Sequence, residues 1–206
     1  METSFKAEVR LWLIRHGEPE ASARGRCYGS LDVGLSPQGH RQAQTVASQL
    51  KKEPLAAIYS SPRLRCRQGA AILANGRNCE VEVINDLTEI DFGQFEGRTY
   101  DEIAVSHPEF YQRWMKHPTE IEFPGGESFA AMRARVIRAA DRLRARHRGE
   151  SVAIVTHGGV IRILLAESLA IASPNIFQIG QRYAALNLIS YVEGCPIVEM
   201  VNGSAE

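Results

Sequence analysis

The chain has 206 residues, and its 24 basic and 24 acidic side chains give a formal net charge of +0. A neutral chain of this length is ordinary for a globular protein, and it offers no overall positive charge to attract nucleic acid. Length alone allows one large domain or two small ones, but we see no linker in the sequence. We therefore expect a single domain over residues 1–206 and no nucleic-acid partner.

Cysteine content and hydropathy indicate the cellular compartment and whether the chain contacts a membrane. The four cysteines form no Cys-x-x-Cys pair, and so few in a chain of this length do not make a disulfide scaffold. The first apolar run, Val9 to Ile14, is interrupted by Arg10 and is too short for a membrane span or a signal peptide. We expect a cytoplasmic protein with no membrane partner.

Short apolar runs alternate with stretches of helical periodicity in the first half of the chain. Residues 9–14 predict a strand. Ser36 followed by Pro37 is typical of a helix N-cap and first helical position, and the periodicity continues to Leu50. The next elements are a strand over 55–59, a helix from Ser60-Ser61-Pro62 to about Leu73, and a strand over 81–84.

Glycine and proline interrupt residues 86–125, so we expect only short helices and loops there. The second half then regains long elements. The pattern predicts an amphipathic helix over 127–147, a strand over 151–156, a helix over 158–170, and strands over 183–192 and 197–201.

This alternation of strands and helices predicts an α/β fold. Helices should cover both faces of a mostly parallel sheet, because parallel strands need crossover connections. The last two strands are joined by the short segment 193–196 and should be antiparallel.

Two His-Gly pairs lie where apolar runs end. Arg15-His16-Gly17 ends the first run, and His157-Gly158 ends the run Val152 to Thr156. In open α/β sheets ligands bind beyond the carboxyl ends of the strands, so both imidazoles are expected to share one crevice. The glycines are expected to let the backbone approach a ligand and expose its amides.

Phosphoryl transfer needs a nucleophile, positive charge around the phosphate oxygens and a proton for the leaving group. His16 offers an imidazole with an ordinary pKa of about 6.5, and the positive charge of Arg15 disfavours its protonation. The guanidinium of Arg15 also suits phosphate oxygens. A metal site is the competing interpretation, but neither histidine lies in a His-x-x-x-His or mixed Cys/His pattern. We therefore expect no metal and no cofactor.

The chain resembles the histidine phosphatase superfamily, the phosphoglycerate mutase-like family. The resembling segments occur in order along most of the sequence: Arg15-His16-Gly17-Glu18, Leu35-Ser36-Pro37-Gln38-Gly39 with Gln42-Ala43, Ser60-Ser61-Pro62 through Arg65 and Gln68, Glu89 with Phe92-Gly93, Glu96-Gly97, Gly126-Glu127-Ser128 and Thr156-His157-Gly158-Gly159. The resemblance implies a three-layer α/β/α sandwich around a mostly parallel mixed sheet.

The resemblance also implies a mechanism through a phosphohistidine. His16 would be the nucleophile, and Arg15, Arg65 and His157 would form the phosphate pocket. Glu89 matches the family's proton donor, because a carboxyl group beside a bound dianion can stay protonated and later act as base toward water. Three other carboxylates are open alternatives, with capping or solvation as their simpler interpretation: Asp91, Glu96 and Glu127.

The chain departs from the family pattern just after its first motif. Pro19 stands where Ser or Thr is frequent, and Ser22 stands where an Asn commonly donates to the phosphate. Ser22 is therefore a candidate phosphate ligand through its hydroxyl, unless Pro19 redirects the loop and turns it away. Gly69 also replaces a frequent Thr.

Within the family, the compact length favours a phosphatase over a phosphoglycerate mutase. The loop Gly25 to Asp32 resembles that of α-ribazole phosphatases, so a small phosphorylated metabolite such as α-ribazole 5'-phosphate is the expected partner. Four residues are further candidates for substrate contact, with solvation or packing as the alternative: Arg24, Arg26, Tyr28 and Trp114. An inactive phosphate-binding module is the alternative from another class, and a homodimer is one option for the assembly.

Overall fold

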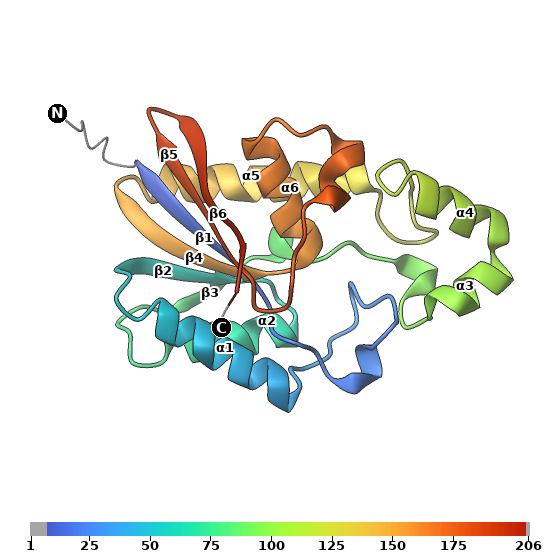
Figure 1. Cartoon of the computed structure of the whole chain (residues 1–206), viewed down its shortest axis with the longest axis horizontal. Coiled ribbons are helices and arrows are strands. Elements are labelled where there is room, and N and C mark those ends of the chain that lie inside the picture. Colours follow the sequence, from blue (N-terminus) through green and yellow to red (C-terminus); the bar gives the residue numbers. More distant parts are fainter. Residues whose placement is uncertain (1–7, 205–206) are drawn as a thin grey trace.

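The computed structural model describes residues 8–204, and its strands form a six-stranded sheet (Figure 1). The order across the sheet is β3-β2-β4-β1-β5-β6. The strands are β1 (Val9–Arg15), β2 (Leu55–Ser60), β3 (Val81–Val83), β4 (Glu150–Thr156), β5 (Leu186–Val192) and β6 (Cys195–Gly203).

The sheet is mixed, with its parallel part on one side. β1 pairs with β4, β4 with β2, and β2 with β3, all in parallel. β5 runs antiparallel to both β1 and β6, which confirms the prediction for the last pair. The hairpin between β5 and β6 turns at Glu193 and Gly194, both of which have positive φ.

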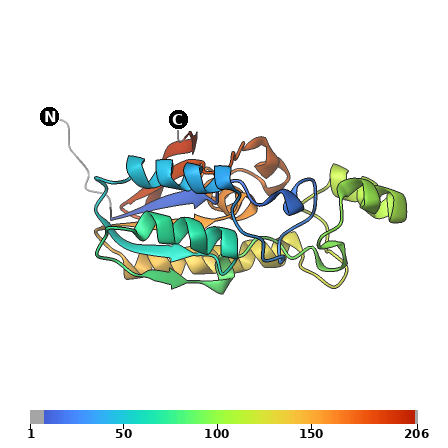
Figure 2. The same cartoon turned by 90° about the horizontal axis from the view of Figure 1, so that it is seen from below.

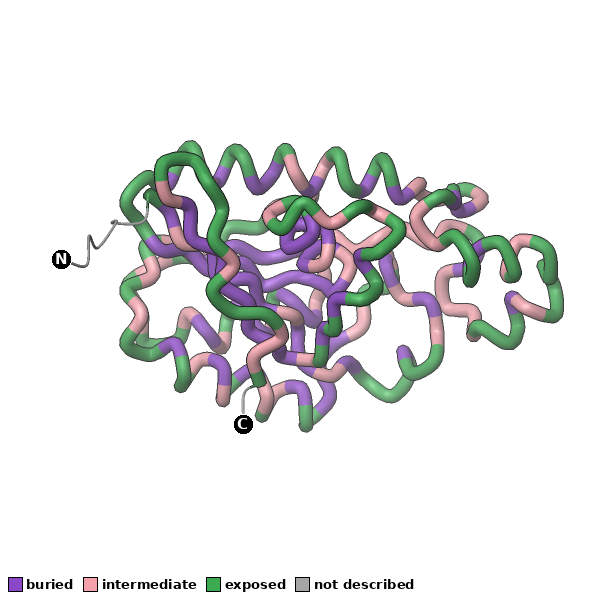
Figure 3. The backbone as a smooth tube through the Cα atoms, turned by 45° about the horizontal axis from the view of Figure 1, so that its top comes forward, coloured by how far each residue is buried: buried purple, intermediate pink, exposed green. Residues whose placement is uncertain are grey.

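Helices cover both faces of the sheet. α1 (Pro37–Gln49) and α2 (Leu64–Ala74) lie on one side, while α5 (Phe129–Arg146) and α6 (Gly158–Ser168) lie on the other (Figure 1). Alternation along β1 explains this, because Trp12 packs with the α1 and α2 side chains and Leu13 with those of α5 and α6. Burial of a side chain such as Leu13 contributes about 1.5–3 kcal/mol. The expected three-layer α/β/α sandwich is confirmed, with the buried residues gathered along the strands (Figure 3).

Residues 86–125 form short elements, as expected. α3 (Tyr100–Ser106) and α4 (Pro108–Lys116) stand off the end of the sheet toward which β1 points (Figure 2). Thr99 and Glu102 form a reciprocal capping box that starts α3. A separate small core under these helices includes Phe95, Trp114 and Phe123. The remaining short elements are 3-10 helices: η1 (Ala21–Ala23), η2 (Asn85–Leu87), η3 (Gly93–Phe95) and η4 (Ser173–Gln178).

Several element boundaries differ by one or two residues from the sequence prediction, and two elements begin several residues later than predicted. α2 begins at Leu64 rather than at 60–62, because Ser60 still pairs within the sheet and Ser61 N–H donates to the Val155 carbonyl at 3.0 Å. β5 begins at Leu186 rather than 183, because Ala184 has positive φ and its N–H donates to the carbonyl of His16. The N-cap at Ser36 is confirmed, since its hydroxyl accepts from Gly39 N–H at 3.0 Å. Within residues 8–204, no helix is long and apolar enough to cross a membrane.

Candidate active site

The register between β1 and β4 brings the two strand-end histidines together. Arg15 pairs with Thr156 at the ends of these parallel strands, and His16 N–H donates to the Thr156 carbonyl at 2.9 Å. His16 and His157 follow directly, with ring centroids 5.3 Å apart. The expected shared crevice is therefore present at the carboxyl ends of the parallel strands.

His16 is held as a neutral imidazole with one free nitrogen. Its Nδ1 lies 2.7 Å from the carbonyl of Gly17, and since a carbonyl only accepts, Nδ1 carries the proton and Nε2 does not. The ring is buried. Burial first, and then the positive charges of Arg65 and Arg15, hold the pKa of His16 well below its ordinary value of 6.5. An unprotonated Nε2 is the form that can attack phosphorus.

His157 is also buried and is bonded through both ring nitrogens. An N–H of Arg65 donates to Nδ1 at 3.3 Å, so Nε2 carries the proton and donates to Ser61 Oγ at 2.7 Å. Ser61 stands there because it follows β2, the neighbour of β4. Burial, followed by the charges of Arg65, His16 and Arg15, holds the pKa of His157 well below 6.5.

Arg65, which is buried, and Arg15, which is half-buried, each place an unpartnered buried donor beside these rings within residues 8–204. Arg65 is fully buried and donates through its Nη atoms to the carbonyls of Leu31, Tyr28 and Gly29. Arg15 donates to the carbonyl of Gln181. The Nε of Arg15 and the Nε of Arg65 are buried without a hydrogen-bond partner in residues 8–204. Because an unmatched buried donor is costly, these N–H groups indicate a place for an anion.

Glu89 brings the carboxylate to this cluster. Its Oε2 accepts from Gly159 N–H, in the first turn of α6, at 3.0 Å, and its Oε1 accepts from the N–H of Ile90 at 3.0 Å. A Cβ at position 159 would lie 2.2 Å from Oε1, so the glycine makes room for the carboxylate. The segment before η3 therefore supplies an acidic group to the crevice between β1 and β4.

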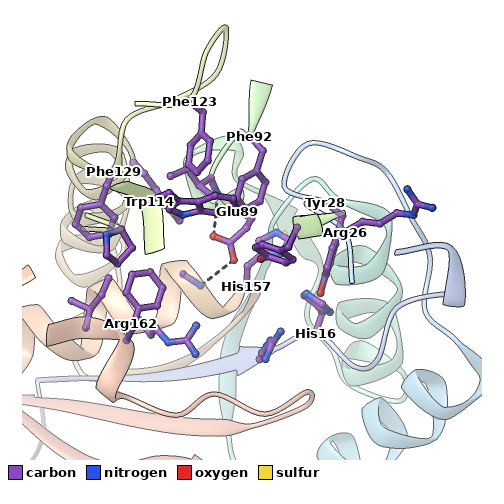
Figure 4. A pocket seen from close by; sticks show the side chains of 18 of the residues that line it. His16, Arg26, Tyr28, Glu89, Phe92, Trp114, Phe123, Phe129, His157 and Arg162 are labelled. Atoms are coloured by element: carbon purple, nitrogen blue, oxygen red, sulfur yellow. Dashed lines mark hydrogen bonds between the residues drawn. The ribbon is translucent and has the colours of Figure 1, made fainter. Parts of the chain in front are cut away.

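The two histidines, the two arginines and Glu89 line one cavity of about 510 Å³ (Figure 4). Its floor is polar and consists of Arg15, His16, Arg65, Glu89 and His157. Its upper wall is apolar and comes largely from α3, α4, α5 and η4. That wall includes Ile90, Phe92, Tyr100, Trp114, Met115, Phe123, Phe129, Met132, Ile176 and Phe177.

The structure thus brings together five of the six predicted site residues. Ser22 is the exception: it is exposed in η1 and does not line the cavity. The loop carrying it folds outward because Pro19 pairs with Leu35 and Glu20 N–H donates to the Gly34 carbonyl. The role predicted for Ser22 therefore gains no support from its position.

The alternative carboxylates have partners of their own. Glu127 forms a bidentate ion pair with Arg135, whose Nε and Nη2 each donate to a carboxylate oxygen of Glu127 at 2.7 Å. Asp91 accepts from the N–H of Gly93. Glu96 accepts from the backbone N–H groups of Ser30, Leu31 and Phe92, which ties the loop before α1 to the loop before η3. The capping interpretation accounts for Asp91 and Glu96.

Several lining residues were not predicted from the sequence, and Arg162 is the most polar of them. It lies on α6, and its Nε donates to the carbonyl of Ile179 at 2.9 Å. Burial and the charge of Arg15 lower its pKa. The sequence feature that could have indicated Arg162 as a site residue is its position as a lone cation in the apolar helical pattern after Gly158. Arg26, Tyr28 and Trp114 do line the cavity, whereas Arg24 is exposed and does not.

Gly17, the glycine of the first motif, was expected to let the backbone approach a ligand. The structure gives another reason for a glycine at this position. A Cβ at Gly17 would lie 2.4 Å from the carbonyl oxygen of Gly39. Gly17 therefore allows the start of α1 to pack against the motif. A Cβ at Gly158 would instead lie 3.1 Å from Arg162 Nη1 and 3.5 Å from Arg15 Nε, so this glycine does leave room within the cavity.

Comparison with known proteins agrees with this geometry. A model of the histidine phosphatase superfamily (branch 1) matches residues 11–204. Phosphoserine phosphatase 1 of Hydrogenobacter thermophilus is 34% identical over 194 residues, which cover 94% of this chain and 92% of that protein. The adenosylcobalamin/alpha-ribazole phosphatase of Salmonella typhimurium is 29% identical over 197 residues, which cover 96% and 98%.

Solved structures give the same result. The crystal structure of the alpha-ribazole phosphatase from Shigella flexneri superposes with a TM-score of 0.86 at 27% identity, covering 94% of this chain and 96% of that one. The chain therefore belongs to the histidine phosphatase superfamily, branch 1. It is a phosphatase of the histidine phosphatase type.

Proposed function

We propose that this protein hydrolyses phosphomonoesters through a phosphohistidine formed at His16, without a metal ion. One observation carries the proposal: the unprotonated Nε2 of His16 belongs to a cavity floor where two buried arginine N–H groups have no partner among residues 8–204. A phosphate group would satisfy both donors while presenting its phosphorus to the nucleophile.

In the first step, Nε2 of His16 forms a bond to phosphorus while the bond from phosphorus to the ester oxygen breaks. Arg15 and Arg65 stabilise the charge on the transferring oxygens, and His157 joins them when a phosphate oxygen replaces Ser61 Oγ as the acceptor of its Nε2–H. Glu89 gives its proton to the leaving oxygen, so the product departs as a neutral alcohol. The enzyme is left with a phosphorylated His16 and an ionised Glu89.

In the second step, water attacks the phosphohistidine. The Glu89 carboxylate takes a proton from this water as its oxygen bonds to phosphorus and the bond from Nε2 to phosphorus breaks. Inorganic phosphate leaves, and both His16 and Glu89 return to their starting states. Every proton is accounted for without another co-reactant.

For the alcohol part of the substrate, we propose an aromatic group, with α-ribazole 5'-phosphate as the specific candidate. The apolar wall supports this choice, since Trp114 stacks on Tyr100 with centroids 5.3 Å apart and Phe92 and Phe123 lie beside it. Glu89 is the only acidic side chain that lines the described cavity. An ammonium group such as that of phosphoserine would find little compensation against this wall.

Turnover of a chromogenic phosphomonoester in the presence of a chelator tests the proposal. We expect metal-free hydrolysis that is lost in His16→Ala and in His16→Gln, because neither variant has a nucleophilic nitrogen at the site. Loss of activity on chelation would show a metal enzyme instead. Inactivity of the wild type toward a panel of phosphorylated metabolites would favour an inactive phosphate-binding module.

The mutase alternative needs its own experiment. Incubation with 3-phosphoglycerate and bisphosphoglycerate should release inorganic phosphate or leave the substrates unchanged. Rapid isomerisation without free phosphate would contradict the proposed hydrolase.

A further inference from the structure

Two tyrosine hydroxyls meet beside His16. Tyr28, from the loop before α1, and Tyr183, from the turn before β5, have their hydroxyl oxygens 3.1 Å apart. Their ring centroids lie 6.4 Å and 5.8 Å from that of His16. Figure 4 shows the Tyr28 side chain extending toward His16. Segments separated by most of the chain therefore place phenol groups next to the nucleophile.

Each tyrosine ring also contacts one of the two arginines of the cavity floor. The Cζ of Arg65 lies 5.0 Å from the centre of the Tyr28 ring, and the Cζ of Arg15 lies 4.3 Å from that of Tyr183. These cation–π contacts hold the rings against the guanidinium groups. The hydroxyls are thus anchored to the same groups that surround the phosphate position.

The hydroxyl pair retains a donor that no protein group uses. When one hydroxyl donates to the other, the second keeps its hydrogen, and neither oxygen has another hydrogen bond in residues 8–204. Burial, followed by the hydrogen bond with Tyr183, raises the pKa of Tyr28, so its hydroxyl stays protonated. The pair is therefore an uncharged hydrogen-bond donor beside the proposed anion site, where Arg15 and Arg65 supply positive charge.

Ser22 does not supply a hydrogen-bond donor to the phosphate position, because it is exposed and lies outside the cavity that Tyr28 lines. We propose that the Tyr28 hydroxyl, held in place by Tyr183, donates a hydrogen bond to the phosphoryl group transferred to and from His16. Tyr28 then contacts the reacting group, and Tyr183 is a positioning residue. The inference rests on the proposed phosphohistidine mechanism, to which it adds a phosphate ligand.

Inhibition by orthovanadate, a mimic of pentacoordinate phosphate, measures this contact. Tyr28→Phe keeps the ring on Arg65 but removes the hydroxyl, so we expect vanadate inhibition about 10- to 100-fold weaker and a similar fall in kcat/KM. Tyr183→Phe should have a smaller effect, because Tyr28 keeps its own hydroxyl. The double variant should match Tyr28→Phe alone, since Tyr183 acts through Tyr28.

Two matched variants separate this contact from other hydroxyl losses. Tyr111→Phe removes a phenol hydroxyl from α4, outside the lining of the cavity, and Ser22→Ala removes the hydroxyl expected from the sequence; both should leave vanadate inhibition unchanged. Unchanged inhibition in Tyr28→Phe, or weakened inhibition in Ser22→Ala, would overturn the inference. A wild type that forms no phosphohistidine would instead overturn the proposed function, so the two failures are distinguishable.

Discussion

The Glu89 carboxylate is held against the first turn of α6, where it accepts a hydrogen bond from the backbone N–H of Gly159 at 3.0 Å. The absence of a side chain at position 159 makes this contact possible, because a Cβ would lie 2.2 Å from the carboxylate. The glycine after the His157-Gly158 pair therefore determines where the proposed proton donor stands.

Gly159→Ala should displace Glu89 without unfolding the protein. The added methyl meets the end of a flexible side chain, so the carboxylate moves rather than the backbone, and we expect kcat to fall about 100- to 1000-fold. Gly69→Ala, within α2, is the control. A Cβ at that position would meet only the Val155 side chain of β4, at 3.4 Å. Steady-state kinetics and thermal unfolding check both variants. Wild-type activity in Gly159→Ala would show that the position of Glu89 is unimportant.

Glu89→Gln should affect esters according to their leaving groups. If Glu89 protonates the departing oxygen, alkyl phosphates should slow by about 100-fold or more, and activated aryl phosphates much less. Glu127→Gln is the comparison, because that carboxylate is paired with Arg135. Equal slowing of all esters by Glu89→Gln would remove it from the proton-donor role.

The buried histidines should make stability depend on pH. His16 and His157 have pKa values well below 6.5, so below pH 6.5 the unfolded chain takes up protons that the folded protein does not. Their contribution to stability is therefore complete above pH 6.5 and is lost as the pH falls toward their folded-state values. Urea unfolding between pH 8 and pH 5 should show a shallower decline for His16→Gln and His157→Gln than for the wild type. Parallel profiles would contradict the neutral state of these rings.

The apolar wall should set substrate preference. Met115 and Phe177 line the cavity but are 48% and 51% exposed, so truncating them should leave the core intact. We expect Met115→Ala and Phe177→Ala to lower kcat/KM for 2-naphthylmethyl phosphate about tenfold while sparing ethyl phosphate. Leu169→Ala is a control, since Leu169 is 47% exposed and lies outside the lining. Equal effects on both esters would show that the alcohol part of the substrate does not contact Met115 or Phe177.

The sequence predicts the two histidines of the polar floor well, because both directly follow predicted strands. His16 and His157 end strongly apolar runs, and parallel strands bring their carboxyl ends to one edge. Arg65 and Glu89 came from the family resemblance rather than from any periodicity. The pairing of β4 between β1 and β2, which adds Ser61 to His157, depends on long-range packing that local patterns do not encode.

The wall and the loop before α1 are harder to predict. Residues 86–125 contain many glycines and prolines, so their helices are short and carry little periodicity from which to place Trp114. The path of the loop depends on the pairing of Pro19 with Leu35, which turns Ser22 outward. Tyr28 belongs to the same loop but lines the cavity, and its carbonyl accepts a hydrogen bond from Arg65. These long-range contacts cannot be read from the local sequence.

Trapping the covalent intermediate tests the central claim most directly. Wild-type protein mixed rapidly with a phosphomonoester and quenched in base should carry one phosphoryl group, mapped by peptide mass spectrometry to His16. The label should be stable in base, labile in acid, and absent from His16→Gln. Phosphate on another residue, or full turnover with no phosphorylated His16 at any quench time, would contradict the account.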